Sequence, residues 1–179
     1  MITRTHIVTR VALFAAVMTV VAQIRIPLGP VPFTLQTFGA LTAGYCLGPA
    51  AGAAAMLLYT AVGLAGLPVF ASGGGPAYVL TPTFGYIIGF ILCAAVTGFL
   101  ARFNRRESLI TAYLFMLAGL AAVYIPGILW LVVSLHWIAD VPAPVVNLLQ
   151  IGLLVPLIGD LITTVPAAAL SVRLRKVLT

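Results

Sequence analysis

Long apolar runs, each nearly free of charge, are the feature that most restricts the fold of this chain. They cover residues 11–24, 38–66, 83–101, 109–135 and 145–172. Several of them approach the roughly 20 apolar residues that a helix needs to cross a bilayer. Charged residues make up 7% of the chain and the mean hydropathy is +1.21, whereas a typical soluble domain has about 25% charged residues. The sequence therefore predicts an integral membrane protein with one domain over residues 1–179.

Basic residues lie in small groups at the ends of these runs, and this pattern predicts the orientation of the chain. The groups are Arg4 and Arg10, then Arg102, Arg105 and Arg106, then Arg173, Arg175 and Lys176. The positive-inside rule places all three groups in the cytoplasm, so that an even number of crossings separates each pair. The net charge of +6 is thus explained by membrane topology, and no nucleic-acid partner is expected. We expect a multi-pass protein of the cell membrane with both termini in the cytoplasm.

The number of membrane crossings between the first and second basic groups is even only if one apolar run crosses the membrane twice. Two runs lie between the second and third basic groups, but three lie between Arg10 and Arg102. Only the 38–66 run is interrupted midway, by Gly48 and Pro49, and a turn there gives four crossings. The sequence thus predicts an all-α fold of six transmembrane helices, two of them short. The 11–24 run is interpreted as the first helix, because it lacks the A-x-A cleavage site of a signal peptide.

Three segments that are rich in proline and glycine but poor in charge connect the helices on the predicted outer side. They are IPLGPVPFTLQTFG (26–39), GLPVFASGGGPAYVLTPT (66–83) and HWIADVPAP (136–144). Backbone that is not helical cannot lie against lipid, so such segments must pack on protein or line a cavity. Short or interrupted helices often mark the binding region of a transporter. We therefore expect the three segments to cover a binding pocket.

Polar residues within the apolar runs, or at their outer ends, are the candidates for this pocket. Asp160 is an acid well inside an apolar run, where a carboxylate is costly and usually faces a partner or a cavity. The alternative for Asp160 is a hydrogen bond that only holds helices together. Asn147 and Gln150 lie nearer the outer end of the same run, and Gln36 and Tyr86 lie where other runs meet the outer segments. Polar side chains at such positions can equally be helix caps or interface anchors.

Sequence motifs for catalysis are missing, which makes a membrane enzyme the weaker class. The single lysine is Lys176, so the chain has no Walker A phosphate loop, and neither H-E-x-x-H nor G-x-S-x-G occurs. His136 and Asp140 form an acid-base pair in one interpretation and are ordinary loop residues in the other. Cys46 and Cys93 lack the spacing of metal ligands and are interpreted as packing residues. No catalytic residue, metal site or cofactor is predicted.

Three strings carry a resemblance to a known family: PLGPVPFTLQTF (27–38), TPTFGYIIGF (81–90) and IGDLITTVPAAALSVRLRK (158–176). They are similar to the BioY family, the biotin-specific substrate-binding (S) components of energy-coupling factor (ECF) transporters. The resemblance implies a six-helix subunit that captures biotin from outside and delivers it with a transmembrane coupling subunit and cytoplasmic ATPases. It also implies that Ala12 and Ala16 contact the coupling subunit. A solitary mode of action stays open, as does an S component or carrier for another small carboxylated or heterocyclic solute.

The resemblance also assigns pocket residues. In the family's G-D-x-x-K motif the acid contacts the ureido ring of biotin; Asp160 matches the acid, but Thr163 stands at the lysine position. Because Thr163 cannot supply a charge, we hypothesise that Arg25 makes a bidentate contact with the ligand carboxylate. The alternative is that Arg25 extends to the lipid headgroups. The candidate substrate-binding residues are Asp160, Gln36, Tyr86, Gly74, Asn147, Gln150, Thr163 and Arg25, with Phe33 and Phe70 as apolar walls and Phe84 narrowing the mouth of the pocket.

Overall fold

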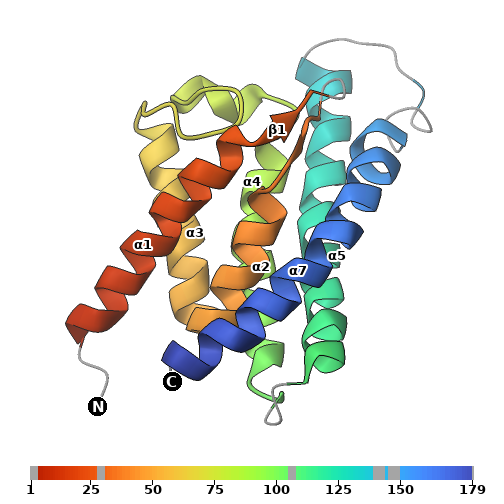
Figure 1. Cartoon of the computed structure of the whole chain (residues 1–179). Coiled ribbons are helices and arrows are strands. Elements are labelled where there is room, and N and C mark those ends of the chain that lie inside the picture. The colour runs from red at the N-terminus through yellow and green to blue at the C-terminus, as the bar shows by residue number, and fades with distance from the viewer. Residues whose placement is uncertain (1–3, 28–30, 105–107, 139–143, 145–149, 179) are drawn as a thin grey trace.

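The computed structural model describes residues 4–27, 31–104, 108–138, 144 and 150–178, which form a bundle of helices (Figure 1). This part of the chain contains six α-helices: α1 (Arg4–Gln23), α2 (Gln36–Leu47), α3 (Pro49–Leu64), α4 (Phe84–Ala101), α5 (Leu109–Val133) and α7 (Val155–Leu178). A π-helical turn (Ser134–Ile138) extends α5, and another (Gln150–Leu154) precedes α7. The connections contain two-residue antiparallel strands, β1 (Arg25–Ile26) and β2 (Phe33–Thr34), and a 3₁₀ helix (Pro76–Leu80). The prediction of a mostly helical fold is confirmed.

Among the described residues, four helical segments are long and apolar enough to cross a membrane. By length and composition they are Arg4–Gln23, Phe84–Ala101, Leu109–His136 and Gly152–Val177. The helices α2 and α3 are shorter, with 12 and 16 residues. At 1.5 Å per residue α2 is about 18 Å long, which is less than the roughly 30 Å of a hydrocarbon core. The two short helices are those that the sequence predicted to be short.

The interruption of the 38–66 run is found where Gly48 meets Pro49. Gly48 has a φ of +82°, in the left-handed region that favours glycine. Its N–H donates to the carbonyl of Gly44 at 2.9 Å, which ends α2. Pro49 then begins α3, where the missing N–H of proline costs no helical hydrogen bond. One apolar run is thereby divided into two helices that run in opposite directions (Figure 1).

The short helix α2 lies at the centre of the bundle. Ten of its twelve residues are buried, and it contacts α1, α3, α4, α5 and α7. The approach to α4 is close, because a Cβ atom on Gly44 would overlap the backbone of Ala94, and one on Gly98 would lie 2.5 Å from the backbone nitrogen of Pro49. Neighbouring helices thus surround α2 along most of its length, and its C-terminal end at Gly48 is half-buried.

The two ends of the bundle differ in composition. The helix α1 begins and α7 ends at one end, whereas β1, β2 and the 66–83 segment lie at the opposite end (Figure 1). Arg102 follows α4 at the first end, and Arg175 and Lys176 lie in the last turn of α7. Arg25 on β1 is the exception among the described arginine and lysine residues, since it lies at the end with the loops.

Candidate binding site

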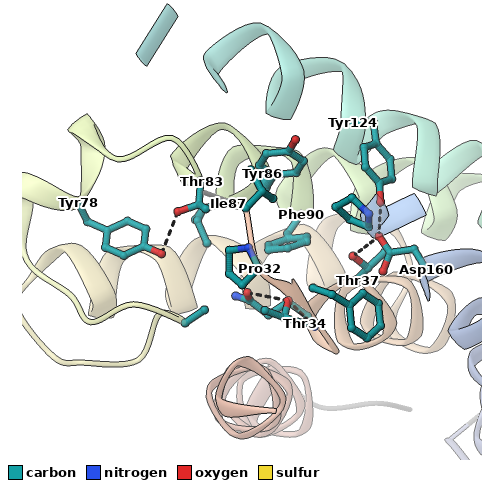
Figure 2. A pocket seen from close by; sticks show the side chains of 15 residues that line it. Pro32, Thr34, Thr37, Tyr78, Thr83, Tyr86, Ile87, Phe90, Tyr124 and Asp160 are labelled. Atoms are coloured by element: carbon teal, nitrogen blue, oxygen red, sulfur yellow. Dashed lines mark hydrogen bonds between the residues drawn. The ribbon is translucent and has the colours of Figure 1, made fainter. Parts of the chain in front are cut away.

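A cavity lies at the loop end of the bundle, between α2, α4, α5 and α7 (Figure 2). It is lined by Val31, Pro32, Phe33, Thr34, Gln36, Thr37, Ala71, Tyr78, Thr83, Tyr86, Ile87, Phe90, Tyr124, Pro156 and Asp160. Among the described residues of this wall, Asp160 carries the ionisable acid. The other polar groups are the hydroxyls of threonine and tyrosine and the carboxamide of Gln36. The remaining wall is apolar or aromatic. A few polar groups converging in an apolar cavity are typical of a site for a small organic molecule.

Asp160 lies on α7 and is held by two hydroxyl groups from other helices. Its side chain is 4% exposed. The Tyr124 hydroxyl on α5 donates to Oδ2 at 2.6 Å, and the Thr37 hydroxyl on α2 donates to the same oxygen at 3.1 Å (Figure 2). The other oxygen, Oδ1, accepts no hydrogen bond from the described part of the chain. Two donors therefore fix the carboxylate and leave one oxygen as an acceptor for a ligand.

The Gln36 carboxamide is oriented by a hydrogen-bond chain that leads out of the cavity. Its Nε2 donates to the Tyr59 hydroxyl at 2.7 Å, and that hydroxyl donates to the Val69 carbonyl at 3.1 Å. Its Oε1 accepts from the Thr34 hydroxyl at 3.0 Å. The carboxamide NH₂ thus points toward Tyr59 on α3, and Oε1 keeps a second lone pair. The chain connects α2, α3 and the 66–83 segment.

A second contact joins the 66–83 segment to β1. The Arg25 guanidinium donates to the Ala71 carbonyl, and Arg25 pairs with Thr34 across the two strands. Ala71 and Thr34 both line the cavity, but Arg25 is exposed and does not. Arg25 therefore ties together two pieces of the cavity wall, and its contact with a ligand carboxylate stays a prediction.

Tyr86 contributes its ring rather than its hydroxyl to the wall. The hydroxyl donates to the Gly152 carbonyl at 2.7 Å and points away from the cavity in Figure 2. The ring meets that of Tyr124 edge to face, with centroids 6.0 Å apart. The hydroxyl of Tyr86 therefore anchors the segment before α7, and its ring supports the residue that holds Asp160.

The cavity is narrow. Its volume is about 40 Å³, whereas an engineered cavity that takes up benzene measures about 150 Å³. An organic ligand of two or more rings therefore enters only when the walls move apart. The connections at the loop end are the part of the wall that is not fixed by helix packing.

The polar groups of the cavity are hydrogen-bond acceptors and neutral donors. No group of three or more histidine, cysteine or acidic side chains is close enough to hold a metal ion in the described residues. The arrangement offers carboxylate and carboxamide acceptors, neutral hydroxyl donors and aromatic faces. It can recognise a compact solute with N–H donors on an apolar body.

Comparison with known proteins assigns the chain to a family. The family model that matches is that of the BioY family, and the match covers residues 1–179. The chain belongs to the BioY family. The resemblance noted in the sequence is thereby confirmed over the whole length of the chain.

Relatives in the BioY family are named as transporters. The "Probable biotin transporter BioY" of Lysinibacillus sphaericus is 38% identical, over 93% of this chain and 85% of that protein. The "Biotin transporter BioY" of Thermotoga maritima is 40% identical, over 93% of this chain and 94% of that protein. A crystal structure of the S-component for biotin from an ECF-type ABC transporter has the same fold, with a TM-score of 0.84 and 28% identity over 97% of this chain and 92% of that chain.

Several residues that were predicted from the sequence meet at the cavity. Asp160, Gln36 and Tyr86 come from three helices and line one wall together, and Phe33 of β2 joins them. The two threonines beside Gln36 also line the cavity. Their positions agree with a shared site, and their roles in binding a ligand stay predictions.

Other candidates lie away from the cavity. The Thr163 hydroxyl donates to the backbone carbonyl of Asp160 at 3.2 Å, within its own helix. Gly74 and Gln150 are exposed and are not part of the described wall. Asn147 lies outside the described residues. Thr163 is thus not part of the described cavity wall, and its role in binding stays a prediction.

Two phenylalanines have roles other than those expected. Phe84 does not narrow the cavity, because its ring packs edge-on against Trp130, with centroids 6.0 Å apart, on the side of α4 that faces α5. Phe70 lies over Gly63, between the rings of Tyr59 and Tyr78 at centroid distances of 5.3 and 4.4 Å. It anchors the 66–83 segment to α3 rather than lining the cavity.

Tyr124 and Tyr78 line the cavity but were not predicted from the sequence. Tyr124 is a tyrosine inside the apolar 109–135 run, and a buried tyrosine hydroxyl usually needs a hydrogen-bond partner. That signal points to a polar neighbour without saying which one. Tyr78 lies in the 3₁₀ helix of the 66–83 segment, where composition alone gave no indication of burial.

Proposed function

We propose that this chain is a membrane-embedded biotin-binding subunit for biotin uptake, the S component of an ECF transporter. The observation that carries the proposal is the buried Asp160 carboxylate, which two hydroxyls hold at the cavity wall in a chain of the BioY family. The names of the relatives and the fold shared with an S-component for biotin support it.

Biotin has the groups that this cavity can recognise. Its ureido ring carries two N–H donors, which Asp160 Oδ1 and Gln36 Oε1 can accept. The thiophane ring and the valeryl chain need apolar walls, which Phe33, Phe90 and Tyr86 provide. The ureido carbonyl needs a donor, and an amide such as Asn147 or Gln150 stays the predicted one.

The proposal is tested by identifying the ligand. The protein is purified in detergent from cells grown with biotin, and the molecules released on denaturation are identified by mass spectrometry. Biotin at a molar ratio near one to the protein is the expected result. Another small carboxylated or heterocyclic solute would indicate a different S component or carrier, and turnover of added biotin would indicate an enzyme.

We further propose that the chain crosses the cell membrane six times with both termini in the cytoplasm. The four long apolar helices supply four crossings, and α2 and α3 supply two short ones. The gathering of basic residues at the end where α1 begins and α7 ends supports this orientation. The loop end with the cavity then faces the outside, where biotin is captured.

Delivery of biotin requires partners, and α1 offers a surface for them. Ala12 and Ala16 are exposed on this helix, and Leu13 and Val20 beside them are 58% and 64% exposed. Small residues let a partner helix approach closely in a membrane. We propose that this face of α1 contacts the coupling subunit, which in turn binds the ATPases.

Replacing Tyr124 with phenylalanine is expected to weaken biotin binding about tenfold. The change keeps the ring and removes the 2.6 Å hydrogen bond to Asp160. A hydrogen bond to a charged group contributes about 1.5–3 kcal/mol, and the remaining Thr37 donor keeps the loss near the lower end. Isothermal titration calorimetry with biotin measures the effect.

Tyr113→Phe is the matched control, because Tyr113 lies three turns earlier on α5 and does not line the cavity. Its affinity for biotin should equal that of the wild type. An unchanged affinity in Tyr124→Phe would show that the Tyr124 hydroxyl has no part in holding Asp160 for the ligand.

A further inference from the structure

The cavity has two polar ends of different character. At one end Tyr124 and Thr37 surround Asp160; at the other, Tyr78 lies beside Thr83, well apart from the first end (Figure 2). Ile87 and Phe90 lie between the two ends. A ligand that places N–H donors at Asp160 therefore directs the rest of its body toward Tyr78.

The Tyr78 end consists of neutral hydroxyl groups. The Thr83 hydroxyl donates to the Tyr78 hydroxyl at 3.1 Å, and the Thr81 hydroxyl donates to the Tyr78 carbonyl at 2.7 Å. Tyr78 is 5% exposed. No described residue accepts a hydrogen bond from its O–H, so this hydroxyl, which belongs to a residue of the cavity wall, can donate to a ligand. A neutral donor of this kind can bind the oxygen of a carboxylate and that of an amide alike.

Cations are scarce at this end of the molecule. The outer segments 26–39, 66–83 and 136–144 contain no lysine or arginine, and Arg25 beside them is exposed and donates to the Ala71 carbonyl. His136 lies in the turn after α5 and is not part of the described cavity wall. An ion pair with an exposed arginine changes an affinity by less than about fivefold.

We infer that the site recognises the acyl end of its ligand through neutral hydroxyls, and that it therefore binds biotin and carboxyl-capped biotin with similar affinity. The inference rests on the proposed function and extends the substrate class to neutral biotin derivatives. The negative charge of the valeryl carboxylate is not what the site selects. The ureido ring, held at Asp160, supplies the specificity.

The test compares biotin with biotinamide, whose primary amide has the size of the carboxylate but no charge. Both are titrated into the purified full-length protein by calorimetry. The dissociation constants of the wild type are expected to differ by less than tenfold. Weaker binding of biotinamide by tenfold or more would overturn the inference. Failure of biotin itself to bind would instead refute the proposed function.

Two variants locate the acyl end. Tyr78→Phe keeps the ring that packs on Phe70 and should weaken biotin and biotinamide by the same factor, about three- to tenfold. An unchanged affinity for both ligands would contradict the placement of the acyl group at Tyr78.

Arg25→Gln should leave the ratio of the affinities for biotin and biotinamide unchanged. A loss of tenfold or more for biotin alone would show that Arg25 recognises the carboxylate and would overturn the inference.

Discussion

Replacing Asp160 with asparagine should reduce the affinity for biotin by one to two orders of magnitude. Asparagine has the size of aspartate and can still accept hydrogen bonds from Tyr124 and Thr37, so the cavity wall keeps its shape. The change removes the negative charge that the ureido N–H groups would meet, and a charge-assisted hydrogen bond contributes about 1.5–3 kcal/mol. Calorimetric titration with biotin measures the loss, and the melting temperature without ligand should change little.

Thr60→Val is a suitable control for the Asp160 variant. Thr60 is buried on α3, its hydroxyl donates to the Met56 carbonyl of its own helix, and it does not line the cavity. Valine has nearly the same shape as threonine and the position lies away from the cavity, so the affinity for biotin should stay within about threefold of the wild type. If Asp160→Asn lowered stability and affinity in parallel, Asp160 would be a packing residue, as the alternative interpretation holds.

Replacing Gly44 with leucine should prevent the bundle from assembling. The side chain would have to occupy the backbone position of Ala94 on α4, and neither helix can move without disturbing the contacts that surround α2. Overpacking of a core usually lowers the free energy of unfolding by about 1–3 kcal/mol, and a clash with backbone atoms lowers it by more than that. The expected result is little or no monodisperse protein in detergent, measured by size-exclusion chromatography, and a lowered melting temperature of any that remains.

Ala54→Leu places the same leucine side chain at an exposed position of α3 and should behave as the wild type does. Monodisperse Gly44→Leu protein with the melting temperature of the wild type would mean that α2 and α4 are farther apart than in this structure. The comparison therefore tests the central position of α2 directly.

The helical layout was predictable because it depends on local chemistry. The division of the 38–66 run follows from glycine and proline standing next to each other, and the structure ends α2 at Gly48 and begins α3 at Pro49. The position of Asp160 on a cavity wall followed from the cost of an unpaired carboxylate within a membrane. The inference about Asp160 needed only its own apolar run, whereas the division of the 38–66 run also used the basic groups on either side of it.

The partners of these residues were harder to predict, because they come from distant parts of the chain. Tyr124 is 36 positions from Asp160, and Tyr59 is 23 positions from Gln36. The pattern of apolar residues fixes which segments are helical, but not which faces of two helices meet. The 66–83 segment was harder still, since a bend in it decides that Tyr78 lines the cavity while Gly74 is exposed.

The hydrogen-bond chain from Gln36 through Tyr59 to the Val69 carbonyl has a consequence for kinetics. It joins Gln36, a residue of the cavity wall, to the 66–83 segment, whose Ala71 and Tyr78 also line the cavity. A solute that is hydrogen-bonded to Gln36 is therefore linked to the 66–83 segment, and its dissociation is expected to be coupled to the opening of that segment. Differences in affinity among solutes of similar shape should then arise mainly from how long each stays bound, rather than from how fast each arrives.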